Sequence, residues 1–238
     1  MEVKELEQAL INYGLIIRGG FNAGTQSDLP VLDTGQKAEA LILVGHGGSS
    51  IWAEFSNSPE YMIGKDHALD RWSQRVAGAI SSRFGLQAVY PFTGPPYQPF
   101  LTWAQRAECQ PVFQSRIGLS LHPVFGLWHA YRFALLSPVR IAEFQQRSAQ
   151  PKVTELSSHC VRCKTSPCLS ACPVNAFSEQ GYDVQACANY LHATPEAACH
   201  TGGCLARKAC PIGNSYQYES AHASFHMKAF VKARLADQ

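Results

Sequence analysis

Apolar residues in the first half of the chain alternate between helical and strand patterns. The sequence at residues 1–14 predicts an amphipathic helix. Its apolar face contains Leu6, Ala9, Leu10 and Tyr13. Short apolar runs at residues 14–21 and 38–45 predict strands. Residues 68–85 predict a longer helix that ends at Gly85.

The alternation continues up to residue 138. Residues 86–91 predict a further strand, and residues 99–108 predict a short helix. Segments 116–123 and 127–138 predict two neighbouring strands across a turn that contains Gly126. Helices and strands in this order predict an α+β sheet domain.

Cysteines are distributed unevenly, which marks a domain boundary. Of the nine cysteines, only Cys109 precedes Cys160, and the other eight lie between Cys160 and Cys210. Residues 139–158 are polar, contain Pro151 and follow Pro138, and therefore suit a linker. The sequence therefore predicts a sheet domain at residues 1–138 and a small cysteine-rich domain with a C-terminal helix at residues 159–238.

Net charge and hydropathy limit the kinds of partner and the cellular location that we expect for this chain. The net charge of +2 gives no basic field, which argues against a nucleic-acid partner. No apolar run reaches the length of a membrane span, and the first residues lack the basic start and apolar run of a signal peptide. We therefore expect a cytoplasmic protein, in which clustered cysteines bind metals or act in catalysis more often than they form disulfides.

The eight clustered cysteines form two groups that each end in Cys-Pro. The first group is C-x2-C-x4-C-x3-C-P, and Cys187 precedes the second, C-x4-C-x5-C-P. This pattern resembles two-cluster ferredoxins, in which the cysteine before proline ligates the other cluster. The resemblance assigns one 4Fe-4S cluster to Cys160, Cys163, Cys168 and Cys210. It assigns the other to Cys172, Cys187, Cys199 and Cys204.

Two structural zinc sites would use the same number of thiolates. Zinc ligands usually come in two close pairs, however, and only Cys160 and Cys163 form a C-x2-C pair. The longer spacings require bulged loops, for which Pro167 and Gly202-Gly203 are suited. The crossed pattern therefore favours iron–sulfur clusters over zinc.

Residues 90–138 are rich in aromatic side chains and poor in acids, which suits a broad, flat, apolar ligand. Within them, RIGLSLHPVFGLWHAYRFALLSP is similar to the HP-x-[FY]-G-G-W segment of CblC-type cobalamin-processing proteins, which have a nitroreductase-like fold. The matching residues are His122, Pro123, Phe125, Gly126 and Trp128. Leu127 replaces the second glycine, and His129 stands where the family has an aromatic residue. The resemblance implies cobalamin binding, with FMN as the alternative ligand of such folds.

Candidate ligand contacts follow from this resemblance. They are His122, Phe125, Gly126, Trp128 and Tyr131. A lone histidine in an apolar strand is often a core residue, and aromatics spaced by three cannot all share one face of a strand. At least one of the three aromatic residues is therefore expected in the core. Arg132 could bind an acidic group or form a surface ion pair.

The order of the parts also resembles epoxyqueuosine reductase, which joins a corrinoid-binding domain to two 4Fe-4S clusters. The CANYL stretch at Cys187 is similar to an isolated cluster ligand of that enzyme. Residues 92–95 read FTGP, without the aspartate that donates a proton there, and the helical-repeat extension that grips tRNA does not follow. These departures argue against nucleoside reduction on tRNA.

For two further sequence features we expect a structural role rather than a functional one. The glycine-rich residues Gly45 to Ser50 could cradle a phosphate, but without a phosphate-binding pattern a plain turn is favoured. Cys109 is expected to be a buried apolar side chain.

The sequence as a whole favours an oxidoreductase, without identifying a catalytic residue. In this interpretation, two clusters pass electrons from a donor, such as a ferredoxin or a flavoprotein, to a cobalamin or small-molecule substrate in the first domain. Three alternatives stay open: a flavin-dependent reductase, an epoxyqueuosine-reductase-like enzyme and a ferredoxin-type electron carrier.

Overall fold

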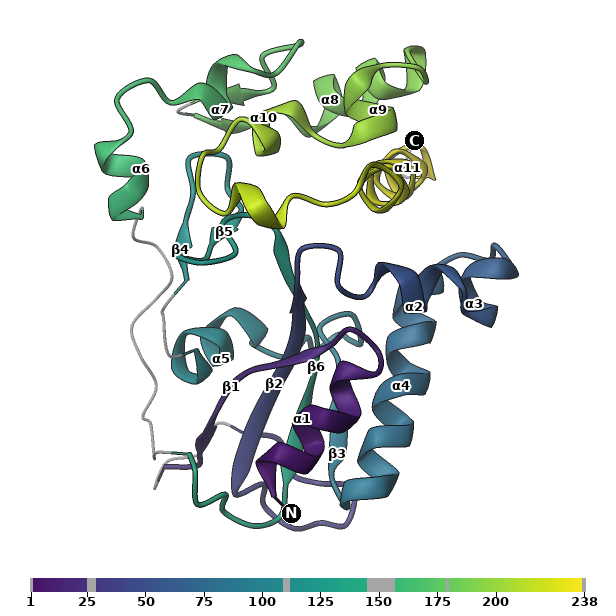
Figure 1. Cartoon of the computed structure of the whole chain (residues 1–238), viewed down its shortest axis with the longest axis vertical. Coiled ribbons are helices and arrows are strands. Elements are labelled where there is room, and N and C mark those ends of the chain that lie inside the picture. Colours follow the sequence, from purple (N-terminus) through teal and green to yellow (C-terminus); the bar gives the residue numbers. More distant parts are fainter. Residues whose placement is uncertain (1, 25–28, 109–111, 145–156, 179, 237–238) are drawn as a thin grey trace. The chain divides into compact units, whose positions relative to one another are not determined.

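The computed structural model describes residues 2–24, 29–108, 112–144, 157–178 and 180–236 (Figure 1). It divides into two compact units, each made of two chain segments. The first unit is Met1–Pro111 with Ala130–Val153, and the second is Val112–His129 with Thr154–Gln238.

This division differs from the predicted boundary between residues 138 and 159. Residues 112–129 group with the cysteine-rich part of the chain because Ile117, Leu121 and Leu127 form a buried cluster with Cys210. Cys109 and residues 145–156, which are most of the predicted linker, lie outside the described residues.

An antiparallel sheet forms the centre of the first unit. Its strand order is β1 (Ile16–Asn22), β2 (Ala40–Gly47), β6 (His129–Ser137) and β3 (Gln87–Val89). β1 pairs with β2, with Phe21 opposite Leu41, and β3 pairs with β6. Side chains Leu41 to Val44 are fully buried, so both faces of β2 are covered.

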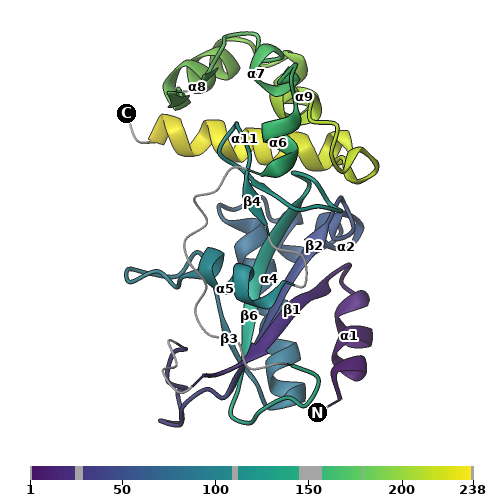
Figure 2. The same cartoon turned by 90° about the vertical axis from the view of Figure 1, so that its left-hand side faces the viewer.

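Helices cover both faces of this sheet. α4 (Ala68–Phe84) and α5 (Phe100–Ala107) lie on opposite sides of it (Figure 2). α1 (Val3–Ile11) packs against β1 and α4 through Leu6 and Leu10, which are fully buried. Two short helices, α2 (Trp52–Ser56) and α3 (Pro59–Met62), precede α4. The predicted α+β sheet and its long helices are therefore present.

α4 ends where the sequence predicts. Gly85 takes φ 65° in the left-handed region, and its N–H bonds back to the carbonyl of Ser81. Glycine adopts this conformation without the steric cost that a Cβ would add.

The predicted hairpin between residues 116–123 and 127–138 is wrong. β5 (Ser120–Leu121) pairs with β4 (Phe113–Gln114), whereas β6 lies between β2 and β3. The intervening chain closes a tight loop, in which the N–H groups of His122 and Gly126 each donate to the other's carbonyl. This loop redirects the chain, so the two segments do not pair.

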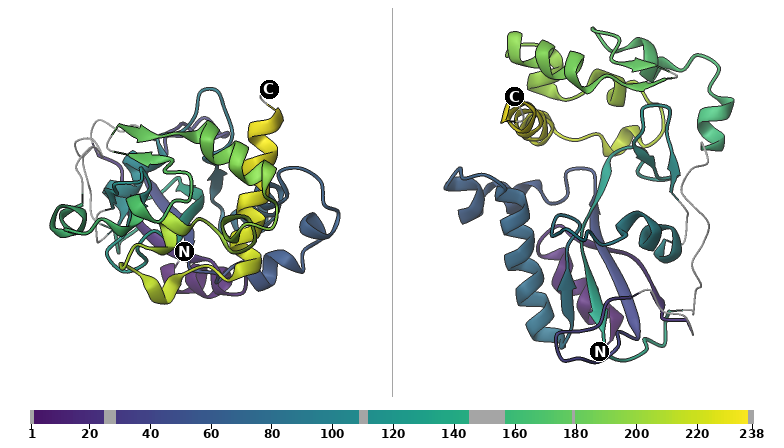
Figure 3. Two further views of the ribbon diagram at one scale, coloured as in Figure 1. Left: turned by 90° about the horizontal axis from the view of Figure 1, so that it is seen from above. Right: turned by 180° about the vertical axis from the view of Figure 1, so that it is seen from behind.

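The second unit consists of short elements followed by one long helix. They are α6 (Ser158–Arg162), α7 (Pro167–Ser170), β7 (Phe177–Ser178), β8 (Gly181–Tyr182), α8 (Val184–Ala193), α9 (Ala198–Gly202), α10 (Leu205–Lys208), the 3-10 helix η1 (Asn214–Tyr216) and α11 (Ser220–Ala236). α11 packs along α8 and α9 (Figure 3), and the predicted C-terminal helix is confirmed.

A close approach fixes α11 against the loop after α9. Gly203 has φ 96°, and a Cβ placed on it would lie 2.7 Å from the Cβ of Ala223. Any side chain at residue 203 would therefore push the helix away. None of the helices in the described part of the chain has the length and apolar character that a membrane span requires.

Candidate functional site

Four thiols of the second unit surround a cavity of about 260 Å³, which we call the first cavity. The thiols belong to Cys160, Cys163, Cys168 and Cys210. Cys160 lies on α6 and Cys168 on α7, while Cys210 follows α10. Short helices joined by tight turns thus bring side chains separated by up to 50 residues around one space.

The other four thiols surround a smaller cavity of about 20 Å³, which we call the second cavity. Its thiols belong to Cys172, Cys187, Cys199 and Cys204. The other lining residues, among them Phe177, Leu191 and Met227, carry no charge. This second cavity has room for little more than one water molecule, so any larger group would have to displace the side chains that now fill it.

These two sets of four are the same sets that the crossed Cys-Pro pattern assigned to two clusters. Cys172 lies with the later cysteines, although it follows Cys168 by only four residues. Cys210 lies with the early ones. All eight carry free thiols.

Burial and mutual proximity disfavour the charged form of several of these thiols. Burial raises the pKa of Cys168, and the thiols of Cys210, Cys160 and Cys163 raise it further. Burial also raises the pKa of Cys210, although a hydrogen bond from the backbone of Ile212 opposes this. A bound metal centre would offset the repulsion between neighbouring thiolates with its positive charge. Because it would replace the thiol protons, its binding would release protons.

Burial also raises the pKa of thiols around the second cavity. Burial raises the pKa of Cys187, against a hydrogen bond from the Tyr182 hydroxyl that lowers it. Burial raises the pKa of Cys204, while the backbone N–H groups of Arg207 and Ala206 oppose this increase. Donors already directed at these sulfurs would stabilise a thiolate once a cation is bound.

Zinc ions and 4Fe-4S clusters can both be held by four thiolates, and a zinc ion needs its sulfurs about 2.3 Å from one point. Within the described residues, no group of three or more histidine, cysteine, aspartate or glutamate side chains is placed to hold a metal ion.

Arg116 is a cavity residue that the sequence analysis missed. It lines the first cavity, and its Nη2 donates to the carbonyl of Cys160 at 3.1 Å. Its Nε is buried and has no hydrogen-bond partner in the described part of the chain. The contact spans 44 residues, so no local motif could have revealed it.

The side chain of His122 contacts residues of its own loop. It is 5% exposed, and its Nδ1 accepts hydrogen bonds from the N–H groups of Val124 and Phe125 at 3.0 and 3.1 Å. The imidazole also stacks on the Phe125 ring, with the two centroids 4.7 Å apart. These contacts give the histidine a structural role in holding the turn.

Phe125 and Gly126 pack against the chain that follows Cys210. The Phe125 ring meets Tyr216 edge-on at 4.9 Å. Gly126 has φ 58°, and a Cβ on it would overlap the carbonyl of Ile212. The motif glycine is therefore required by a close backbone approach beside the first cavity.

Trp128 is a core residue of the second unit. It is 1% exposed, packs edge-on against Tyr218 at 5.3 Å and lies under the guanidinium of Arg207 at 4.4 Å. Arg207 also donates from Nε to the carbonyl of Leu127 at 3.0 Å. The indole is thus enclosed by protein.

Tyr131 belongs to the first unit, unlike the other four candidates. Its hydroxyl donates to Glu108 Oε1 at 3.0 Å, and Glu108 pairs with Arg18 at 2.6 Å. Burial, followed by the Glu108 carboxylate, raises the pKa of Tyr131. The five predicted ligand contacts are therefore divided between the two units, and each has protein partners of its own.

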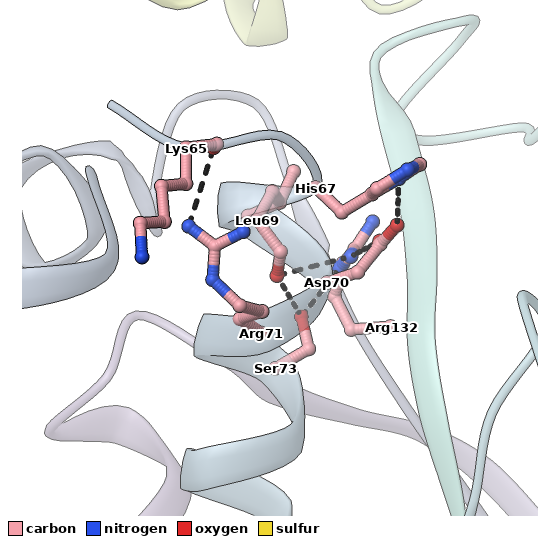
Figure 4. Close-up of polar contacts among 7 residues, drawn as sticks. All are labelled: Lys65, His67, Leu69, Asp70, Arg71, Ser73 and Arg132. Atoms are coloured by element: carbon pink, nitrogen blue, oxygen red, sulfur yellow. Dashed lines mark hydrogen bonds and ion pairs between the residues drawn. The ribbon is translucent and has the colours of Figure 1, made fainter. Parts of the chain in front are cut away.

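Arg132 forms an ion pair, but the pair is largely buried rather than at the surface, because the side chains of Arg132 and Asp70 are 11% and 30% exposed. Its Nη2 lies 2.8 Å from Asp70 Oδ1, and its Nε donates to Ser73 Oγ at 3.0 Å (Figure 4). Ser73 in turn donates to the carbonyl of Leu69 at 2.7 Å. This arrangement ties β6 to the first turns of α4.

Gly45 to Gly47 end strand β2, and residues 48–50 form the plain turn that the sequence favours. Gly48 takes φ 58°, and Ser50 Oγ donates to the carbonyl of Gly14 at 2.6 Å. A separate groove of about 490 Å³ lies in the first unit, lined by Thr34, Ser81 and Tyr90 among others. Burial raises the pKa of Tyr90. No sequence motif marked this groove.

Comparisons with known proteins bear on the fold. No family model matches the chain, and no curated protein matches it. A crystal structure of the B12-trafficking protein CblC from C. elegans, described as a homologue of human MMACHC, is similar with a TM-score of 0.51 and 15% identity. The match covers 96% of this chain and 95% of that one. At this identity the likeness shows the fold alone: the chain has a CblC-like, mixed α/β fold.

Proposed function

We propose that this chain is an iron–sulfur redox protein of the cobalamin-processing type. Cys160, Cys163, Cys168 and Cys210 would hold one 4Fe-4S cluster in this proposal. Cys172, Cys187, Cys199 and Cys204 would hold the other. The observation that carries the proposal is the gathering of eight free thiols into two sets of four. The second cavity, of about 20 Å³, would have to widen to admit a cluster.

The clusters would supply one-electron transfer when bound. The chain's own residues hold the thiols in place, exclude water from the second site and direct backbone N–H groups at Cys204. Such hydrogen bonds and the burial of a site are what tune cluster potentials. The apolar second cavity and the cation-lined first one would therefore give two centres of different potential.

Cobalamin is proposed as the electron acceptor because the fold is CblC-like and the similar C. elegans protein is described as a B12-trafficking protein. The first unit would then carry the corrinoid or a reducible small molecule. FMN stays the alternative ligand. Neither the motif histidine nor Trp128 supports a ligand contact directly, since both are enclosed by protein.

Anaerobic reconstitution tests the metal centres. Eight cysteines in two sets predict about eight iron and eight acid-labile sulfide per chain. Stoichiometric zinc without visible absorbance would contradict the proposal. Titration of the reconstituted protein with cobalamin, and separately with FMN, tests the ligand by a change in the visible spectrum.

The grouping of the thiols has its own test. Cys210→Ser should remove the cluster of Cys160, Cys163 and Cys168, whereas Cys172→Ser should remove the other. Anaerobic crystal structures of the two variants locate the loss. A cluster lost from the site nearest in sequence, in either variant, would contradict the crossed ligation.

A further inference from the structure

Two cations lie in the segment that borders the first cavity: Arg162 lines the cavity, and Lys164 follows two residues later. His159 also lines the cavity, and all three side chains are exposed. No aspartate or glutamate lines this cavity, and residues 157–178 contain none. The region therefore carries a local positive charge that the net charge of the chain does not reveal.

These cations are available to a partner. Within the described residues, neither Arg162 nor Lys164 makes an ion pair or a side-chain hydrogen bond, and exposed charges lose little solvation on meeting a partner at a rim. Val161, which lies between His159 and Arg162, is 64% exposed and adds an apolar contact. We call His159, Val161, Arg162 and Lys164 the cationic rim.

The two thiol cavities differ in their surroundings. Each set has three half-buried thiols and one buried thiol, Cys210 in the first set and Cys199 in the second. The lining differs in charge, because Arg116 and Arg162 line the first cavity and only uncharged residues line the second. An acidic protein would therefore be attracted to the first site rather than to the second.

We propose that the cationic rim docks an acidic electron-transfer protein, which reduces the cluster of the first cavity. This inference rests on the proposed function. The step moves one electron from the reduced donor to the cluster, and no bond forms or breaks. Positive potential around the site would steer the acidic partner and raise the rate of encounter.

The test uses the reconstituted chain and a reduced, acidic plant-type ferredoxin as the probe. Arg162→Glu and Lys164→Glu are each compared with Lys228→Glu, which makes the same charge change at an exposed position on α11 outside the cavity lining. Stopped-flow absorbance measures electron transfer at low and high salt, and calorimetry measures binding. Iron and sulfide are assayed for every variant.

We expect each rim reversal to slow association about tenfold at low salt, with the difference lost at high salt, while Lys228→Glu changes little. Equal effects of all three reversals, binding that ignores salt, or equal binding of an acidic protein without a redox centre would overturn the docking surface. Chains that bind the ferredoxin through the rim but contain no clusters would support the surface and contradict the proposed function alone.

Discussion

Replacing Gly126 with alanine tests the contact that connects the loop of His122 to the first cavity. Gly126 has φ 58°, a conformation that costs a non-glycine residue about 1–2 kcal/mol. The new Cβ would also overlap the carbonyl of Ile212, two residues beyond Cys210. Forcing a methyl group into a filled space costs about 1–3 kcal/mol more. We therefore expect the free energy of unfolding to fall by about 2–5 kcal/mol.

Gly118 provides the matched control. It has φ 76°, yet a Cβ on it would meet nothing within 4 Å. Gly118→Ala should therefore cost only the backbone component, about 1–2 kcal/mol. Urea unfolding of both variants, followed by circular dichroism, measures the difference, and iron content after reconstitution reports on the nearby site. Equal stability of the two variants would refute the argument that the Ile212 backbone requires glycine at residue 126.

The remaining predictions use the same measurements at other sites. Trp128→Ala should destabilise the second unit by about 3–5 kcal/mol, as expected for a truncated core aromatic; lost cobalamin binding at unchanged stability would contradict its core role. Arg116→Gln should lower the midpoint potential of the first cluster, on the order of 50 mV, by removing a positive charge; spectroelectrochemistry measures this, and an equal shift of both clusters would count against it. Asp70→Asn should destabilise the first unit by about 1–2 kcal/mol, because Arg132 loses its counter-charge; unchanged urea unfolding would contradict this. Before metal loading, iodoacetamide should alkylate Cys204 more slowly than a free cysteine at pH 8, because its raised pKa leaves less thiolate; mass spectrometry showing an equal rate would argue otherwise.

Local signals in the sequence were enough for the helices α1, α4, α5 and α11 and for the strands of the sheet in the first unit. The short helices α6 to α10 of the cysteine-rich part were not predicted. The buried positions of α1 follow helical spacing, and Gly85 ends α4 because it accepts a left-handed conformation. The strands of the first unit are short apolar runs that the sheet buries. The error came at residues 116–138, where two apolar segments looked like a hairpin. Their partners are set by contacts far away in the chain, which a local pattern does not contain.

Cysteine grouping and the ligand contacts show the same contrast. Spacing and the Cys-Pro repeats predicted the two sets of thiols that line the two cavities. Ligation of clusters by these sets stays a prediction. The role of Trp128 was not predictable, since an aromatic residue in a motif can pack on a ligand or on Tyr218 with equal chemistry. Arg116 was missed because its neighbour, Cys160, lies 44 residues further on.

The interrupted second unit has a consequence for its synthesis. Residues 112–129 leave the ribosome before the rest of their unit. The hydrogen bond between the carbonyl of Leu127 and Arg207 can form only after a further 80 residues have been synthesised. At about 5–20 residues per second, that delay lasts about 4–16 seconds. During this time Ile117, Leu121 and Leu127 lack the cysteine-rich segment that buries them. The growing chain therefore passes through a stage in which these apolar side chains lack their final partners, and a fragment that starts after the linker would lack part of its own core.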